Sequence, residues 1–411
     1  MQIKSSREPL FHLVKRDKIP WWKAWLIRIG AILLALVACA VISELITGVK
    51  PKDLFTTILH SWFGDADYRE KFSIVQNRKF WILLQETAIL LCVALAVTPA
   101  FKMRFWNIGA EGQVLMGCLA SAGCMLLIGD SVSPSMLLVI MFIAAVVAGA
   151  IWAIIPAIFK AQWNTNETLF TLMLNYVAMQ IVAYFCIEWA PSNGSNVVGV
   201  INRDLQTADG GNYGWLPNIF EGFVKDVERP RMPEYAHIIL IVLVLTALMF
   251  IYLRYSKQGY EISVVGESEN TARYIGINVK KVILRTMLIS GAICGIAGFL
   301  LVSGIEHTIA MDTVGGRGFT AIMVSWLAKF NPFVMIVTSF LFVIMDSGAS
   351  KVATDLRVNE SFSEVLTALI IFFIIGCEFF INYKIVFSRR NGKKLVSASN
   401  AVTSSDNDNS K

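Results

Sequence analysis

The sequence predicts an all-α polytopic membrane protein with about ten transmembrane helices. Of its 411 residues, 55% are hydrophobic and only 16% are charged, against roughly 25% charged residues in an average soluble domain. Runs of about 20 apolar residues recur along most of the chain, and each can cross the ~30 Å hydrocarbon core of a bilayer. Lys and Arg gather in the two tails, which favours a topology with both termini in the cytoplasm.

Ten apolar segments are predicted to span the membrane. They cover residues 24–46, 80–100, 108–128, 135–159, 168–190, 236–253, 282–303, 318–329, 332–350 and 364–383. The eighth is short enough to be a re-entrant half-helix. The first follows a basic stretch and has no small-residue cleavage site beside it, so we interpret it as a retained helix and not as a signal peptide.

The expected organisation follows from these segments. A basic cytoplasmic N-terminal tail covers residues 1–23, the transmembrane domain covers 24–383, and a basic, disordered cytoplasmic tail covers 384–411. Two long external segments are expected, together with one long cytoplasmic loop. The external segments are residues 47–79 and 191–235, and the loop is residues 254–281.

Composition also argues against several classes of site. The seven cysteines all lie in apolar runs without a CxxC pair, which indicates buried thiols and neither disulfides nor a metal site. The four histidines are scattered, and no catalytic constellation is evident. The net charge of +6 indicates topology and contact with anionic membrane lipid, because no basic patch is interleaved with aromatics as in a nucleic-acid-binding surface.

The cytoplasmic loop is long for a simple connection and predicts a short helix. Residues 262–265 are expected to be extended, and Ser268 is expected to cap a helix over residues 269–275 with Glu269 in its first turn. Gly276 is expected to end that helix. On these features the helix is either an interfacial amphipathic helix or a docking element.

Polar residues inside apolar runs are candidates for function, because a polar group in hydrocarbon is costly. The stretch FWNIGAEGQVLMG holds Asn107, Glu111 and Gln113. Glu111 falls in the first turn of a helix that begins near residue 108, where a carboxylate suits the helix dipole without any transport role. Gln113, Gly117 and Ser121 recur every four residues, a stripe that suits either helix packing or a water-filled path.

A second polar stripe begins the fifth predicted span. Asn166 and Glu167 start the helix, and Thr171 and Asn175 share a face with Thr168. Thr171 and Asn175 are therefore candidates for lining a substrate path, together with Asn107, Glu111, Gln113 and Glu167. Glu167 has capping as its alternative role.

The remaining charged or polar candidates lie close to predicted span ends. Four carboxylates are expected at the membrane interface, namely Glu86, Asp346, Glu364 and Glu378. Glu306 and His307 are expected in a solvated outer loop, with contact to a binding protein as the alternative. Gly117, Gly291, Gly295 and Gly298 are expected to let helices pack closely.

Five motifs, in order, resemble the permeases of ABC importers that serve branched-chain amino acids, ribose-type sugars and nucleosides. They are NIGAEGQ (107–113), NETLFTLMLNY (166–176), GESENTARYIGI (266–277), SGAICGIAG (290–298) and GGRGFTAIMVSWLAKFNP (315–332). The resemblance covers roughly residues 80–383 and is greatest to the nucleoside and simple-sugar subgroup.

The resemblance implies a division of labour between subunits. This chain has no GxxxxGK[ST] sequence, so ATP and Mg²⁺ would be bound by a separate ATPase and no cofactor by this chain. The cytoplasmic loop would couple to that ATPase through Gly266, Glu267, Ser268, Asn270, Ala272, Arg273 and Gly276. The resemblance further implies an inverted repeat of two related halves. It also implies a homo- or heterodimer of permeases and an extracytoplasmic solute-binding protein or lipoprotein.

The chain departs from the family pattern at three places. Glu267 replaces a small polar residue or Asn, and Trp326-Leu-Ala-Lys329 replaces a run of small residues ending in Gly. The external segments are also long for the group, so their roles do not carry over.

The resulting hypothesis is a permease that moves a nucleoside or related small polar solute into the cell by alternating access, in a bacterial cytoplasmic membrane. A sugar and a branched-chain amino acid are the alternative solutes. An ion-coupled secondary transporter is the alternative mechanism, although the carboxylates lie at predicted span ends. A membrane-embedded enzyme ranks last.

Overall fold

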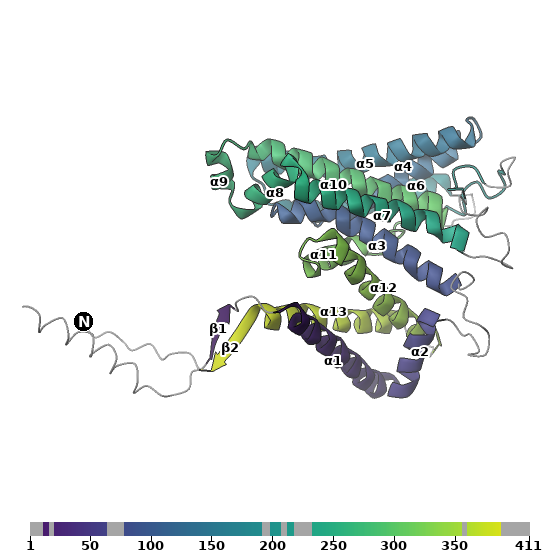
Figure 1. The fold of residues 1–411 in the computed structure, drawn as a ribbon. Helices are drawn as coiled ribbons and strands as arrows, with labels where there is room; N and C mark the ends of the chain where they lie inside the picture. Colours follow the sequence, from purple (N-terminus) through teal and green to yellow (C-terminus); the bar gives the residue numbers. More distant parts are fainter. Residues whose placement is uncertain are drawn as a thin grey trace, which may run out of the picture. The chain divides into compact units, whose positions relative to one another are not determined.

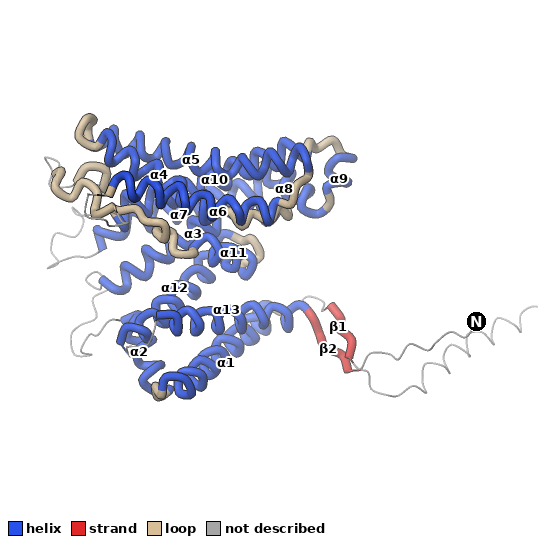
Figure 2. Tube along the Cα trace, turned by 180° about the vertical axis from the view of Figure 1, so that it is seen from behind, coloured by secondary structure: helices blue, strands red, loops and turns tan. Residues whose placement is uncertain are grey.

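The computed structural model describes residues 11–15, 20–63, 78–190, 198–206, 212–217, 232–355 and 360–387. These residues are almost entirely helical, which confirms the predicted class, and they include one two-stranded ribbon that was not predicted (Figures 1 and 2). The chain divides into two compact units. One unit comprises residues 1–48 and 365–411, and the other comprises residues 49–364.

The first unit holds helix α1 (Trp21–Thr47), most of helix α13 (Glu360–Asn382) and the ribbon. Strand β1 (Phe11–Lys15) pairs antiparallel with strand β2 (Tyr383–Phe387). The ribbon corrects the expectation of irregular tails at these residues. Because the two strands flank the first and last long helices, the pairing brings both ends of the unit to the same place.

The second unit is a helical bundle. Its helices are α2 (Pro51–Phe63), α3 (Arg78–Lys102), α4 (Ala110–Ile128), α5 (Pro134–Trp163), α6 (Glu167–Trp189), α7 (Met232–Tyr255), α8 (Lys257–Glu267), α9 (Glu269–Tyr274), α10 (Val279–Leu301), the π-helical turn η2 (Val302–Glu306), α11 (Arg317–Leu327) and α12 (Pro332–Asp355). Helices α3, α4 and α10 are buried along most of their length, so they form the centre of the bundle.

Eight helices in the described part of the chain are long and apolar enough to cross a membrane, against ten predicted segments. Helix α13 contributes a shorter apolar stretch, Val365–Ile381. Helix α11 has 11 residues and rises about 16 Å at 1.5 Å per residue, so it cannot cross alone. The eighth predicted segment is therefore a half-helix.

Glycines let α10 approach α4 and α5 at backbone distance. A Cβ at Gly295 would lie 2.2 Å from the carbonyl oxygen of Ala145, and a Cβ at Gly291 would lie 2.4 Å from that of Gly149. A Cβ at Gly117 would lie 2.8 Å from Cα of Gly295. These helices gain backbone-to-backbone van der Waals contact that any larger residue would prevent. Gly298 meets α4 in the same way.

The described parts of the two segments predicted to be external are more structured than expected. Residues 51–63 form α2, whose Leu54 is fully buried. In the second segment, the N–H of Ile201 donates to the carbonyl oxygen of His307 at 2.8 Å, and the ring of Trp215 stacks on His307 at 3.7 Å. The prediction that His307 lies in a solvated loop is therefore wrong. Burial lowers the pKa of its imidazole to about 4.

The loop predicted to be cytoplasmic, residues 254–281, contains two helices, where one was predicted. Helix α8 covers residues 262–265, which were predicted to be extended. Ile262 and Val265 lie three residues apart and are both buried, so tertiary packing outweighs the strand preference of this β-branched run. The one helix that was predicted is confirmed as α9, where the side chain of Ser268 accepts from the N–H of Thr271 at 3.2 Å. Gly276 follows with φ of 84°, a conformation that favours glycine.

Candidate functional site

Two helix N-termini converge on the carboxylate of Glu111. Glu111 lies in the first turn of α4, as predicted, and is 3% exposed. Its Oε1 accepts from the N–H of Gly316 at 2.8 Å, and its Oε2 accepts from the N–H of Gly318 at 2.7 Å. These two N–H groups open α11, so one carboxylate satisfies donors of a second helix while it sits in the positive field of its own.

The segment that precedes α4 runs beside α11 in the opposite direction. At the C-terminal end of α11, the ring of Trp326 lies 5.3 Å from that of Trp106, and at the N-terminal end Gly318 meets Glu111. We call this contact, made by residues 105–111 and Arg317–Leu327, the α4–α11 seam. Helix α11 rises about 16 Å, which is about half the thickness of a hydrocarbon core. Glu111 therefore lies about that distance from the C-terminal end of α11.

A salt bridge closes the seam toward α3. Nη2 of Arg317 lies 2.5 Å from Oε2 of Glu86, and the two side chains are 23% and 28% exposed. Glu86, which was predicted to lie near a span end, lies two turns inside α3. The guanidinium of Arg317 thus lies near two carboxylates, those of Glu86 and Glu111.

A buried amide network lies on the other side of the seam. Oδ1 of Asn107 accepts from the N–H of Gly109 and from Nε2 of Gln113, both at 3.1 Å. Nδ2 of Asn107 donates to the hydroxyl of Ser290 on α10 at 3.4 Å. The network joins the irregular segment to two helices. It satisfies polar groups that would otherwise be unpaired in the core.

The polar stripe of α6 serves the same irregular segment. Asn175 accepts from the N–H of Gly112 and donates to the carbonyl oxygen of Ile108, both at 2.9 Å. The hydroxyl of Thr171 accepts from the N–H of Ile108 at 3.2 Å. Backbone groups outside a helix need such partners within a membrane, so this stripe supports the interruption between α3 and α4.

Glu167 is the one predicted path residue that lies apart from the seam. Its carboxylate lies 2.9 Å from Nζ of Lys160 on α5. Asn166 supplies the cap of α6, because its side chain accepts from the N–H groups of Thr168 and Leu169. The other five candidates, Asn107, Glu111, Gln113, Thr171 and Asn175, are all buried around the seam.

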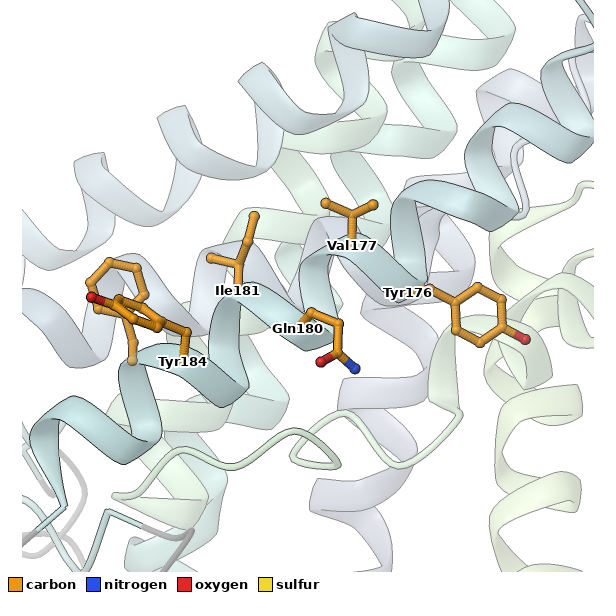
Figure 3. A pocket seen from close by; sticks show the side chains of 6 residues that line it. Tyr176, Val177, Gln180, Ile181 and Tyr184 are labelled. Atoms are coloured by element: carbon orange, nitrogen blue, oxygen red, sulfur yellow. The ribbon is translucent and has the colours of Figure 1, made fainter.

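Sequence reasoning missed a second polar line on α6. Tyr176, Gln180 and Tyr184 follow one another at four-residue spacing and are exposed along a hollow of about 500 Å³. Figure 3 shows their side chains projecting from one length of the helix, with Val177 and Ile181 beside them. The four-residue spacing of polar side chains in an apolar span was the available signal.

Helix α9 and the residue after it, in the loop predicted to be cytoplasmic, present a small projecting surface. Ala272 of α9 is buried, whereas Tyr274 is 93% exposed and Ile275 is 51% exposed. Among the described residues, Arg273 pairs within its own helix, with Nη2 at 3.3 Å from Oε2 of Glu269. A Cβ at Gly266 would lie 2.2 Å from the carbonyl oxygen of Lys102, so this glycine holds α8 against the end of α3.

Cysteine and metal chemistry add nothing to this arrangement. The seven cysteines are free thiols, buried except for the half-buried Cys124, as predicted. Among the described residues, no group of three or more His, Cys, Asp or Glu side chains is placed to hold a metal ion.

A bundle of spanning helices, inside which the half-helix α11 meets the irregular segment before α4, defines a multi-pass membrane transport protein. The family model described as the branched-chain amino acid transport system permease component matches residues 81–375, and the chain belongs to this family. It is the permease component of an ABC importer, a transport subunit that works with ATPase and permease partners.

Relatives of the chain have more specific names. The chain is 28% identical to a glucose ABC transporter permease protein of Haloferax volcanii over 384 residues, which cover 91% of this chain and 94% of that one. It is 28% identical to a guanosine ABC transporter permease protein of Bacillus subtilis over 352 residues, which cover 85% and 92%. A solved chain described as an inward-facing ABC transporter of metal-chelate type gives a TM-score of 0.45 at 14% identity, covering 87% of this chain and 99% of that chain.

Proposed function

We propose that this permease moves a nucleoside, or a related small polar solute, into the cell by alternating access. The observation that carries the proposal is the exposed line of Tyr176, Gln180 and Tyr184 along the hollow on α6. The exposed wall of this hollow is almost entirely apolar, and the rings of the two tyrosines are part of it. Aromatic faces stack on planar bases, and the amide of Gln180 supplies a donor and an acceptor.

A nucleoside fits this line better than the alternative solutes do. The names of two relatives specify guanosine and nucleoside transport, and another specifies glucose. Stacking on a tyrosine ring favours an aromatic base over a branched-chain amino acid. A sugar would offer a weaker contact through its ring face and hydroxyl groups.

Uptake into proteoliposomes that contain the whole transporter tests the solute. Guanosine, glucose and leucine are compared as radiolabelled probes, with ATP supplied on the side of the ATPase. We expect guanosine to be taken up with the highest kcat/KM, and Tyr184→Ala to raise its KM about tenfold. Met173→Ala is the control, because Met173 is an exposed apolar residue of the same helix. Equal effects of both variants would remove the α6 line from the path.

The buried seam residues form a separate candidate path. They line a route only when α4, α6 and α11 move apart. Asn175→Leu would break both hydrogen bonds to the interrupted segment while it keeps similar volume. We expect the variant complex to assemble and to transport guanosine at least tenfold more slowly. Wild-type uptake would remove Asn175 from the list.

We further propose that α9 docks on a separate ATPase, which binds ATP and Mg²⁺. Tyr274 and Ile275 present an apolar knob, and Ser268, Asn270 and Gly276 shape the loop that holds it. We expect Tyr274→Ala and Arg273→Ala to lower solute-stimulated ATPase activity of the assembled complex severalfold. Tyr260→Ala, an exposed tyrosine on α8, is the control. Unchanged stimulation in both α9 variants would show that the loop is not the coupling element.

The remaining partners follow from the same scheme. An extracytoplasmic binding protein would deliver the solute, and two permease chains, identical or related, would form the membrane layer of a bacterial cytoplasmic membrane. Vesicles that lack the ATPase test the ion-coupled alternative. Guanosine uptake driven in them by a H⁺ or Na⁺ gradient would overturn the ATP-driven scheme.

A further inference from the structure

A small cavity lies between α8 and the start of α10, next to the residues that follow α9. Its volume is about 330 Å³. The charged residues on its wall are Lys257, Glu261, Lys281 and Arg285, and residues 275–278 close one side. This is the size of a compact polar headgroup, and it is separate from the seam and from the hollow on α6.

The cavity carries excess positive charge. Its wall holds three cationic side chains and one carboxylate, which leaves an excess of two positive charges. That carboxylate is already engaged, because Oε2 of Glu261 lies 2.9 Å from Nη2 of Arg285. Lys257 and Lys281 have no acidic partner among the described residues, so their ammonium groups are available to an anion.

A further feature of the wall favours an anion. Helix α10, of 23 residues, begins at the cavity, so the positive end of its dipole adds to the field of the lysines. An oxyanion with several acceptor oxygens would satisfy donors that the protein leaves open.

The position of the cavity indicates the source of that anion. Tyr255 at the end of α7 is 72% exposed and Tyr260 on α8 is 62% exposed. Exposed tyrosines beside the ends of spanning helices are typical of the headgroup level of a membrane. The cavity thus opens where lipid phosphates lie and where basic residues attract anionic lipid.

We propose that this cavity binds the phosphate headgroup of an anionic membrane lipid, held by Lys257, Lys281 and Arg285. The lipid would brace α8 and the residues 275–278 that support α9. The proposal rests on the cytoplasmic placement of the loop in the proposed function. It makes no use of the identity of the solute.

The test uses the assembled transporter in nanodiscs of phosphatidylcholine with and without phosphatidylglycerol. Native mass spectrometry measures the phosphatidylglycerol that the complex retains. We expect Lys281→Gln to weaken retention about fivefold, since a lysine near a charged surface contributes about a factor of five. Lys280→Gln is the matched control, because Lys280 is the neighbouring exposed lysine and is not on the cavity wall. We expect it to change retention less than twofold.

Three results would overturn the proposal. Equal losses for Lys280→Gln and Lys281→Gln would indicate general surface attraction and no site. Displacement by millimolar glycerol 3-phosphate, with no preference for phosphatidylglycerol, would assign the cavity to a soluble phosphate ester. A fall in ATPase activity of Lys281→Gln that is equal in both nanodiscs, with lipid retention unchanged, would place Lys281 in a protein contact. The lipid readout is independent of guanosine uptake, so failure of one proposal is distinguishable from failure of the other.

Discussion

The carboxylate of Glu111 and the main-chain N–H of Gly318 are joined by a hydrogen bond of 2.7 Å across 207 positions of the chain. Through this bond and its twin to Gly316, the start of one helix caps the start of another inside the bundle. The carboxylate of Glu111 thus replaces the cap that α11 lacks locally, since Gly316 has no side chain to supply one.

Glu111→Gln should destabilise the permease. A carboxamide can accept one of the two N–H groups, but it turns its own NH₂ toward the other, which leaves a buried donor unpaired. We expect a loss of about 2 kcal/mol, seen as a lower Tm of the purified complex. Glu267→Gln is the control, because Glu267 is exposed. An unchanged Tm for Glu111→Gln would contradict the capping role.

The ion pair of Arg317 and Glu86 should show energetic coupling. Both side chains are partly exposed, so we expect a coupling energy of only about 1 kcal/mol. A double-mutant cycle with Arg317→Gln and Glu86→Gln, measured by denaturant unfolding of the detergent-solubilised permease, gives this value. Strictly additive losses would mean that the two side chains do not interact in solution.

Gly295→Ala should impair assembly of the bundle. The added methyl would lie 2.2 Å from the carbonyl oxygen of Ala145, so α5 and α10 must separate. We expect a loss of about 2–3 kcal/mol from this overpacking, measured as reduced Tm and yield. Gly30→Ala provides the comparison, because nothing lies within 4 Å of a Cβ there and alanine favours a helix. Equal Tm values for the two variants would disprove close packing at Gly295.

The pH dependence of stability should carry the signature of His307. Its folded pKa is lowered to about 4 from an ordinary value of 6.5, so the unfolded state binds more protons between these values. Stability is therefore full above pH 6.5 and falls as the pH drops toward 4, by up to about 3 kcal/mol. Thermal unfolding at pH 7.5 and 5.0 measures the difference.

The same comparison with His307→Asn isolates the imidazole. Asparagine tolerates the positive φ of 52° at this position but does not titrate. We expect the pH-dependent part of the Tm difference to shrink in this variant. A difference as large as that of the wild type would assign the pH dependence to other groups.

Apolar periodicity was sufficient to predict the helical class and most spans. The short eighth segment, the cap at Ser268 and the glycine at Gly276 were also predicted, because each depends on residues within one or two turns. The prediction that residues 262–265 are extended was wrong for the opposite reason. Their local strand preference is outweighed by burial of Ile262 and Val265, which depends on residues distant in the chain.

The sequence predicted which residues belong to the candidate site, but not which groups they contact. The contact between Glu111 and the start of α11 joins segments about 200 residues apart, and no local pattern encodes it. The partners of Asn175 are backbone groups of an interrupted helix, which a sequence does not display. The ion pair of Glu86 with Arg317 was not predictable for a related reason, because it joins residues 231 positions apart in the chain.

The paired indole rings of Trp106 and Trp326 give the molecule a built-in optical reporter. Their centroids lie 5.3 Å apart, with planes inclined at 33°, at the end of the half-helix opposite Glu111. Two chromophores at this distance couple their electronic transitions. Near-ultraviolet circular dichroism of the unlabelled transporter would then follow the half-helix directly, and any step of the transport cycle that separates the rings would register as loss of the couplet.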